Sequence, residues 1–181
     1  MYAATNIVYN ENATTGLFKL PKGIARTCVT SPPYYGLRDY GHPDQIGLEE
    51  TPEQFIAKLV EVFRGVKHAL ADDGTLWINI GDSYNSSAAG NKTPCGFSQT
   101  RPSRRSGNGD QETVATGKKL IDNLKPKDLI GIPWMLAFAL RADGWYLRQD
   151  IIWHKPNPMP ESVTDRCTKS HEYIFLLSKS E

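Results

Sequence analysis

The sequence has 181 residues, of which 39% are hydrophobic and 23% charged, and its formal net charge is +1. These values fit one globular domain with a real core, and the absence of any run of about 18 apolar residues argues against a membrane span. The first residues have neither the basic nor the apolar segment of a secretion signal. Cys28, Cys95 and Cys167 lie far apart, which argues against disulfides and a zinc site. We therefore predict reduced thiols and no metal in a cytoplasmic protein.

Two short apolar segments, residues 5–8 and 26–30, are predicted to be buried strands. The second runs directly into Ser31, Pro32 and Pro33, where two prolines cannot continue the hydrogen-bond ladder of a sheet. The carboxyl end of this strand is therefore expected to face whatever lies above the sheet.

The clearest predicted helix begins at Thr51, which is followed by Pro52 at the first helical position and by Gln54 three residues after the cap. Apolar residues then recur at helical spacing up to Leu70, and the turn-forming residues 72–74 are expected to end the helix. The apolar segment 75–80 follows as a strand that is expected to be covered on both faces.

A long polar stretch follows, and we predict that residues 85–125 form a mobile or disordered basic loop. Residues 90–127 contain eight basic and three acidic side chains, so this stretch has a net charge of +5 and the rest of the chain −4. Such a segment is either a contact for nucleic acid or a solvated loop.

Order is expected again in a helix over 133–142, a strand over 145–153, an extended loop over 155–160 and a strand over 172–177. Strands that alternate with helices predict a layered α/β sheet. The loop after Thr30 then lies at the carboxyl end of a strand, where such sheets bind their ligands.

The segment formed by Ser31, Pro32, Pro33 and Tyr34 offers a hydroxyl, rigidly held backbone carbonyls and an aromatic ring. The oxygens can accept the N–H groups of an exocyclic base amine and direct its lone pair at a methyl donor. The ring can stack on a base that has been flipped out of a duplex. Simple turn formation by Ser31 and core packing by Tyr34 are the alternatives.

This segment resembles motif IV of the amino-methyltransferases, in which Asp, Asn or Ser precedes Pro-Pro and an aromatic residue. Residues 35–41, 74–84, 150–160 and 166–175 are similar to neighbouring blocks of phage and bacterial DNA methylases, and they occur in the same order. The resemblance covers residues 5–84 and 126–178. Its motif order is that of the β-class DNA amino-methyltransferases, which belong to the N-4/N-6 family.

The resemblance implies a Rossmann-like, S-adenosylmethionine-dependent methyltransferase fold, of which residues 1–181 form a single partial domain, the catalytic half. In the β-class order the glycine-rich cofactor turn comes last, and this sequence ends without one. Thr30 and Ser31 are therefore the only cofactor contacts that we predict. Double-stranded DNA is the expected partner, with a homodimer or a complementing C-terminal half as further partners of a bacterial or phage-encoded restriction–modification enzyme.

The resemblance assigns catalytic roles to residues 31–34. For other polar residues near the expected ligand edge, two roles are considered. Arg38 contacts phosphate or forms an exposed ion pair, and Asp82 lines the pocket or caps a helix. For Glu172, a structural role is favoured over a catalytic one. The predicted DNA-binding residues are Tyr35, Arg38, Arg101, Arg104, Arg105, His154 and Lys155.

The residue at position 31 bears on the target atom. A serine at this position resembles the motif of enzymes that methylate N4 of cytosine, whereas aspartate is more typical of enzymes that act on N6 of adenine. We therefore favour cytosine N4, and adenine N6 stays open. A half that binds DNA or a partner chain without catalysis, and a methyltransferase acting on RNA or on protein glutamine, are the remaining alternatives.

Overall fold

The structure is a computed structural model that describes residues 6–85, 120–161 and 163–181. Within these ranges, no helix combines the length and the apolar character needed to cross a membrane. The elements, in chain order, are α1 (Ala13–Gly16), η1 (Leu17–Lys19), β1 (Ala25–Thr30), α2 (Pro52–Ala69), β2 (Leu70–Ile80), α3 (Ile132–Ala142), β3 (Tyr146–His154) and β4 (His171–Ser178).

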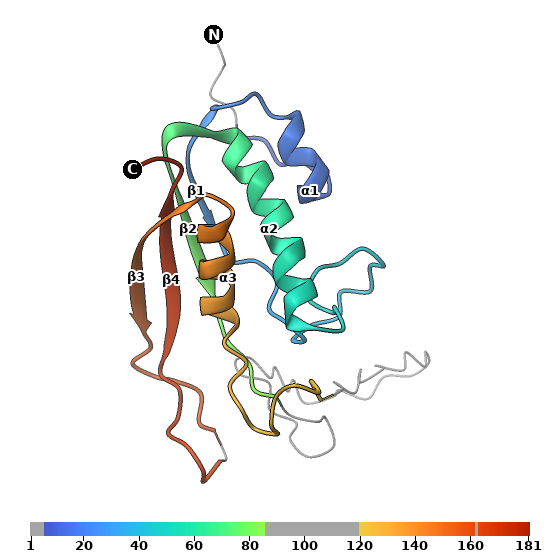
Figure 1. The fold of residues 1–181 in the computed structure, drawn as a ribbon, viewed down its shortest axis with the longest axis vertical. Coiled ribbons are helices and arrows are strands. Elements are labelled where there is room, and N and C mark those ends of the chain that lie inside the picture. The colour runs from blue at the N-terminus through green and yellow to red at the C-terminus, as the bar shows by residue number, and fades with distance from the viewer. Residues whose placement is uncertain (1–5, 86–119, 162) are drawn as a thin grey trace, which may run out of the picture.

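The four strands form one mixed sheet in the order β1-β2-β4-β3 (Figure 1). β1 and β2 run parallel, whereas β4 runs antiparallel to both of its neighbours. This sheet with its helices is the layered α/β arrangement that the sequence predicts. β1 lies at one edge, and no strand in the described part of the chain pairs with its outer side.

The predicted start of α2 is confirmed. Thr51 is the N-cap, its hydroxyl accepts from the amide of Gln54, and the Gln54 side chain accepts from the Thr51 amide. Two of the amides left free at a helix start are thus satisfied. The helix buries the face that carries Phe55, Leu59 and Phe63.

The end of α2 differs from the expectation. The helix stops at Ala69, and β2 already begins at Leu70, which is fully buried. Residues 72–74 lie inside β2, at the irregularity between the pairs Ala25–Leu70 and Thr27–Thr75. Because Leu70 is buried in the sheet, the strand begins before residues 72–74. These turn-forming residues therefore produce a bulge inside β2 instead of ending the helix.

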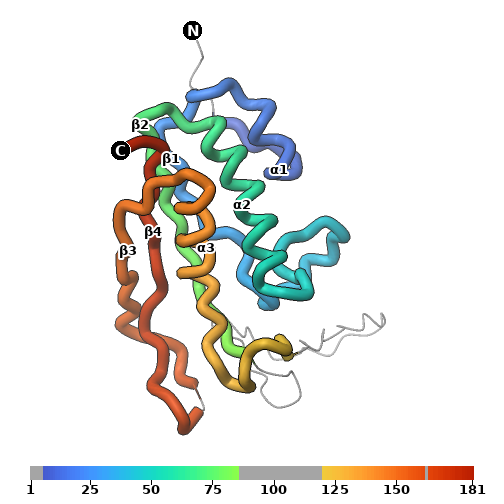
Figure 2. The backbone as a smooth tube through the Cα atoms, viewed as in Figure 1, coloured from blue at the N-terminus to red at the C-terminus, as the bar shows by residue number. Residues whose placement is uncertain are grey.

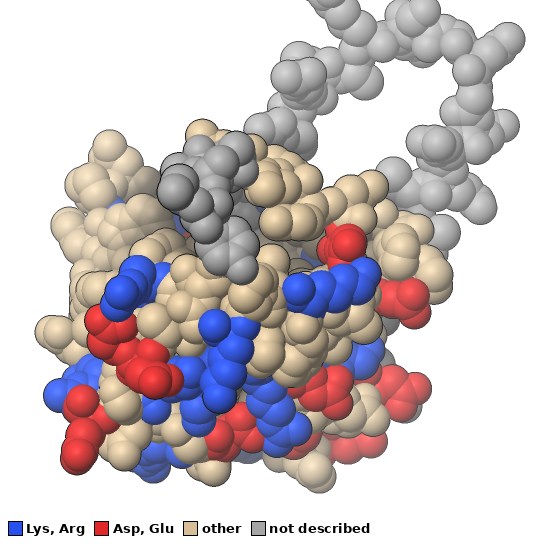
Figure 3. Space-filling view, turned by 90° about the horizontal axis from the view of Figure 1, so that it is seen from above, with Lys and Arg blue, Asp and Glu red and all other residues tan. Residues whose placement is uncertain are grey.

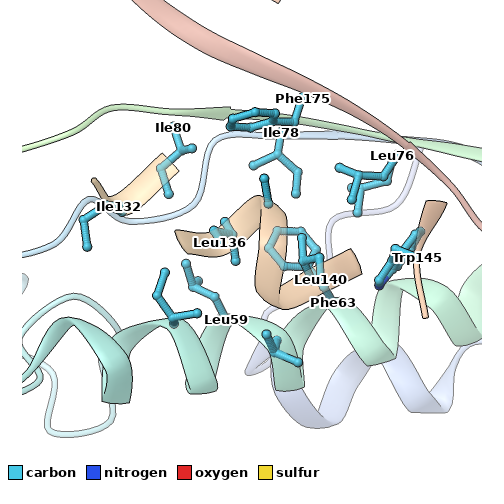
Figure 4. Close-up of a cluster of buried hydrophobic side chains, with 14 of the residues drawn as sticks. Leu59, Phe63, Leu76, Ile78, Ile80, Ile132, Leu136, Leu140, Trp145 and Phe175 are labelled. Carbon is cyan, nitrogen blue, oxygen red and sulfur yellow. The ribbon is translucent and has the colours of Figure 1, made fainter. Parts of the chain in front are cut away.

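The core lies between the sheet and the two long helices, and Figure 4 shows its side chains pointing toward one another from α2, α3, β2 and β4. Figure 2 shows that α2 and α3 lie on the same side of the strands. The side chains drawn with labels are Leu59, Phe63, Leu76, Ile78, Ile80, Ile132, Leu136, Leu140, Trp145 and Phe175.

The opposite face of the sheet has no helix over it within the described residues. Alternate residues of β2 point to this face and are only half-buried, among them Trp77 and Asn79. The registers place Val29, which is 77% exposed, beside Trp77, and they place Leu176 on the other side of Trp77. We call this surface the bare face. The expectation that residues 75–80 are covered on both faces is therefore wrong for this chain.

Two further expectations need correction. Residues 6–8 form no strand, and Val8 is 96% exposed; Thr5 lies outside the described residues. The predicted loop over 85–125 includes Asn85, which is 1% exposed and bonded to residues 121–125; residues 86–119 of this loop lie outside the described residues. The Asn85 amide donates to the Leu124 carbonyl at 2.8 Å and accepts from the Ile121 amide at 3.0 Å, which fixes both ends of the segment.

Candidate active site

Polar side chains from several segments contact one another at one end of the sheet. This is the lower end in Figure 1, where β1 and β2 finish. Because β1 and β2 run parallel, both finish at this end, and antiparallel β4 begins there. β3 also finishes there, with His154 paired to His171 and Trp153 paired to Glu172. Four segments that are far apart in sequence therefore meet at the carboxyl ends of β1 and β2, as the sequence predicts for a ligand site.

Residues 31–34 follow β1, and we call them the diproline corner. Ser31 is exposed, Pro32 is buried and Pro33 is half-buried. Gly47 packs against the backbone of the diproline corner. It has φ +117°, and a Cβ on it would lie 3.1 Å from the Tyr34 carbonyl oxygen. Only glycine combines that backbone angle with such a close approach. Ser31 is thus an exposed residue on a rigid support, and its side chain hydrogen-bonds with the Tyr34 phenol.

Tyr34 is held at both its ring and its hydroxyl. The ring lies against Gly81, where an added Cβ would be 2.7 Å from Tyr34 Cε2. The hydroxyl oxygen is 3.3 Å from Asn79 Oδ1 and 3.4 Å from Glu172 Oε2, and it donates to one of them. Burial and then the charge of Glu172 raise the pKa of the phenol, against a lowering hydrogen bond with Ser31. The phenol is therefore a protonated donor near neutral pH.

Glu172 accepts hydrogen bonds from two groups besides its contact with the Tyr34 hydroxyl. The Asn79 amide donates to its Oε2 at 3.2 Å, and Lys155 Nζ donates to its Oε1. Burial raises the pKa of this carboxyl, but the hydrogen bonds from Lys155 and Asn79 outweigh it, so the pKa lies below its ordinary value. Glu172 therefore carries a fixed negative charge directly behind Tyr34.

Asp82 follows β2 and serves as a cap, one of the two roles considered from sequence. Its carboxylate accepts from the backbone amides of Gly131 and Ile132, each at 3.0 Å, at the start of α3. Burial raises the pKa of this carboxyl, and the backbone hydrogen bonds only partly offset it. Asp82 thus ties the end of β2 to the first turn of α3.

Tyr35 does not lie where a DNA contact needs it. Its side chain is 5% exposed, its ring packs on Phe55 at a centroid distance of 5.4 Å, and its hydroxyl donates to the Glu50 carbonyl. The residue after the rigid corner points into the core because α2 offers an apolar surface there. Packing in the core therefore accounts for Tyr35 without a DNA contact.

The other predicted DNA contacts are distributed unevenly. Arg38 and His154 are exposed, whereas Lys155 is half-buried and paired with Glu172. Arg101, Arg104 and Arg105 lie outside the described residues. An open hollow of about 530 Å³ lies beside the Arg38 segment, and its lining includes Asp39, His42 and Glu49.

The end of the molecule opposite to the site has no surface of uniform sign. Figure 3 looks onto that end and shows basic and acidic side chains interspersed. The ion pairs near the start of β2 include Arg26 with Asp73 and Lys179 with Asp72. A surface of mixed charge does not attract a phosphate backbone as a basic surface does, so the face shown in Figure 3 is not a favoured DNA contact.

No group of three or more His, Cys, Asp or Glu side chains with metal-binding geometry occurs among the described residues. Cys28 and Cys167 are free thiols, and burial raises the pKa of Cys28. Sequence reasoning missed the link between Tyr34, Asn79 and Glu172. An asparagine inside an otherwise apolar strand was the available signal, because a polar group there needs a partner.

The model of the DNA methylase family matches residues 25–181. The chain is 52% identical over 174 residues to the Type II methyltransferase M.Cfr9I of Citrobacter freundii, which is 96% of this chain and 54% of the relative. It is 56% identical over 153 residues to the Type II methyltransferase M.SmaI of Serratia marcescens, which is 84% of this chain and 49% of the relative.

The chain belongs to the N-4/N-6 DNA methylase family. The resemblance that the diproline corner carries is therefore confirmed. The chain spans about half the length of the curated methylases that it matches.

Solved methylase structures share the fold. The putative DNA modification methylase TTHA0409 of Thermus thermophilus, complexed with S-adenosyl-L-methionine, aligns with a TM-score of 0.56 and 23% identity over 93% of this chain and 53% of that one. PvuII DNA methyltransferase (cytosine-N4-specific) aligns with a TM-score of 0.59 and 13% identity over 94% and 48%. The predicted methyltransferase fold, present here in part, is thus confirmed.

Proposed function

We propose that this chain is the catalytic part of a site-specific DNA methyltransferase. It transfers a methyl group from S-adenosylmethionine to the exocyclic amine of a flipped base, with cytosine N4 as the favoured target. The observation that carries the proposal is the diproline corner at the carboxyl end of β1, where Ser31 is exposed and Tyr34 is anchored on Gly81. The Type II methyltransferases at 52% and 56% identity support the same reaction.

The corner performs two tasks in this proposal. The Ser31 hydroxyl and the Pro32 carbonyl accept the two N–H groups of the amine, which orients the nitrogen lone pair outward from the site. The Tyr34 ring stacks on the extruded base. The gain in rate comes from orientation of the amine and from hydrogen bonds to it, with no deprotonation beforehand. As the new N–C bond forms, the S–CH3 bond of the donor would break to leave a thioether, and the surplus amine proton would pass to water.

The described residues do not by themselves form a complete cofactor site. β1 runs into the diproline corner instead of a glycine-rich turn and a helix, so no helix N-terminus follows it. Thr30 and Ser31 provide one edge at most. S-adenosylmethionine supplies the methyl group when bound, and most of its contacts belong to a part of the enzyme outside the described residues.

The favoured partner of this chain is a complementing half that docks on the bare face and on the open edge of β1. A sheet in this class is normally covered on both faces, and exposed apolar side chains such as Val29 and Trp153 remain here. The relatives, which are about twice as long, supply the length for such a half. In this proposal the complementing half adds a strand beside β1 and helices over the bare face.

Docking is tested with Val29→Lys, which places a charge on the bare face, and with Val8→Lys as the control, since Val8 is 96% exposed outside the sheet. Titration of the chain with the C-terminal segment of a relative, in a binding assay, is expected to show at least about tenfold weaker affinity for V29K only. Equal affinities for both variants, or sedimentation of this chain as a homodimer through this face, contradict the docking proposal.

The reaction is tested by methyl incorporation into DNA, with this chain alone and with the chain extended by the C-terminal segment of the family. We expect activity in the extended form only. An extended form that is inert on every DNA contradicts the proposal. Parallel assays on RNA and on protein distinguish the other acceptor classes.

A further inference from the structure

Glu172 links Tyr34 to the rigid part of the sheet. The diproline corner lies in a segment without helix or strand, whereas Glu172 belongs to β4 and is paired with Trp153 of β3. Its Oε2 lies 3.4 Å from the Tyr34 hydroxyl. Through this contact, the orientation of the Tyr34 ring is fixed relative to the paired strands β3 and β4.

Asn79 provides a second hydrogen-bond acceptor for Tyr34, because the orientation of its side-chain amide is fixed. Its amide nitrogen donates to Glu172 Oε2 and to the Tyr173 carbonyl, both at 3.2 Å, which leaves its Oδ1 as the atom that faces the Tyr34 hydroxyl at 3.3 Å. The phenol proton therefore meets two acceptors from neighbouring strands, one of them charged. Hydrogen bonds to a charged acceptor are the stronger ones.

Lys155 completes the arrangement from the end of β3. Its ammonium group pairs with Glu172 Oε1, the oxygen that Tyr34 and Asn79 leave free. The Glu172 side chain is 19% exposed and the Lys155 side chain 38% exposed. A carboxylate at this depth requires compensation for its lost hydration, and Lys155 provides it.

We propose that Glu172 is a positioning residue that sets the orientation of the Tyr34 ring for stacking on the target base, with Lys155 holding the Glu172 carboxylate in place. This inference rests on the methyl-transfer function proposed above. It also gives Lys155 a role that differs from the phosphate contact predicted from sequence.

The first test uses methyl transfer by the extended enzyme. We expect Glu172→Ala to lower kcat by about 10- to 100-fold and to change the KM for DNA less than about threefold, because the ring is misplaced while DNA contacts persist. Glu172→Gln, which keeps an acceptor, is expected to recover part of the loss. Asp73→Asn, which removes an ion pair at the far end of β2, is the matched control and should leave kcat unchanged.

A double-mutant cycle tests the route through the hydroxyl. If Glu172 acts on Tyr34, the double variant Y34F/E172A is no slower than the slower single variant, because both remove the same contact. Independent losses that multiply overturn the proposal. Lys155→Met is expected to lower kcat, as E172A does; a raised KM with a weaker salt dependence shows a phosphate contact instead.

The second test uses this chain without DNA and separates the two proposals. Carbon-13 labelled tyrosine gives NMR signals for the Tyr34 ring, assigned with Y34F. These signals should shift in E172A, shift less in E172Q and stay fixed in D73N. Unchanged signals in E172A overturn the positioning role even if methyl transfer occurs, whereas shifted signals with an inert wild-type enzyme contradict only the proposed function.

Discussion

At the scale of single residues, the position of the diproline corner at the carboxyl end of β1 could be predicted from the sequence, because the segment is rigid and follows an apolar strand. Ser31, Pro32, Pro33 and Tyr34 are contiguous, and proline fixes their backbone, so the segment offers a hydroxyl and a ring; the neighbouring blocks that resemble the family separate this interpretation from a simple turn. The contacts of Glu172 were not predictable, because they depend on the register that pairs β4 with two other strands. For Tyr35 the sequence left packing and DNA contact open, and the contact of its ring with Phe55 favours packing.

Gly81 gives the first prediction at this scale. In Gly81→Ala the new Cβ would lie 2.7 Å from Tyr34 Cε2, so the ring must move. We expect kcat of the extended enzyme to fall by about tenfold or more, because small misplacements near the reacting groups are costly. Gly16→Ala, whose nearest neighbour is the flexible Glu11 side chain, is the control. Unchanged kcat in G81A would mean that the ring position is unimportant.

The lowered pKa of Glu172 predicts a dependence of stability on pH. The ionised form is favoured in the folded chain, so its contribution is present above the ordinary carboxyl value of 4.5 and is lost as the pH falls through the lower folded value. The difference in Tm between wild type and E172Q should therefore be larger at neutral pH than under acid conditions. Thermal melts at both pH values measure this, and a difference that grows in acid contradicts it.

At the scale of elements, helix starts were easier to predict than strand limits. Thr51 and Gln54 form a local capping box whose partners are three residues apart, so the start of α2 was visible in the sequence. The early start of β2 at Leu70 and the lack of a strand over residues 6–8 depend on tertiary neighbours. The partner of Asp82 was equally hidden, because α3 begins far along the chain.

Asp82 gives the prediction at the element scale. Asp82→Ala removes the acceptor for the Gly131 and Ile132 amides and should lower the free energy of unfolding by about 1–2 kcal/mol. Asp82→Asn keeps an oxygen acceptor and is expected to lose less. Urea denaturation of the three proteins compares them, and equal losses in both variants would show that Asp82 does not act as a cap.

At the scale of the whole molecule, a sheet with helices on one side brings the diproline corner to one end and leaves one face and the edge at β1 open. The fold class could be predicted because strands and helices alternate and the motif blocks keep the order of the family. The bare face could not, since the exposure of Val29 and the half-burial of Trp77 appear only when both helices are seen on one side. Completion of this sheet is what the account requires for activity.

The most direct measurement is mass spectrometry of nucleosides from DNA treated with the extended enzyme and with its Ser31→Ala variant. We expect N4-methylcytosine with the wild-type protein and a loss of about 10²-fold or more in S31A, because the amine loses a positioned acceptor. N6-methyladenine in its place would move the target to adenine while leaving the corner in its role. Methylation by S31A at the wild-type rate would contradict the central claim that this corner holds the amine.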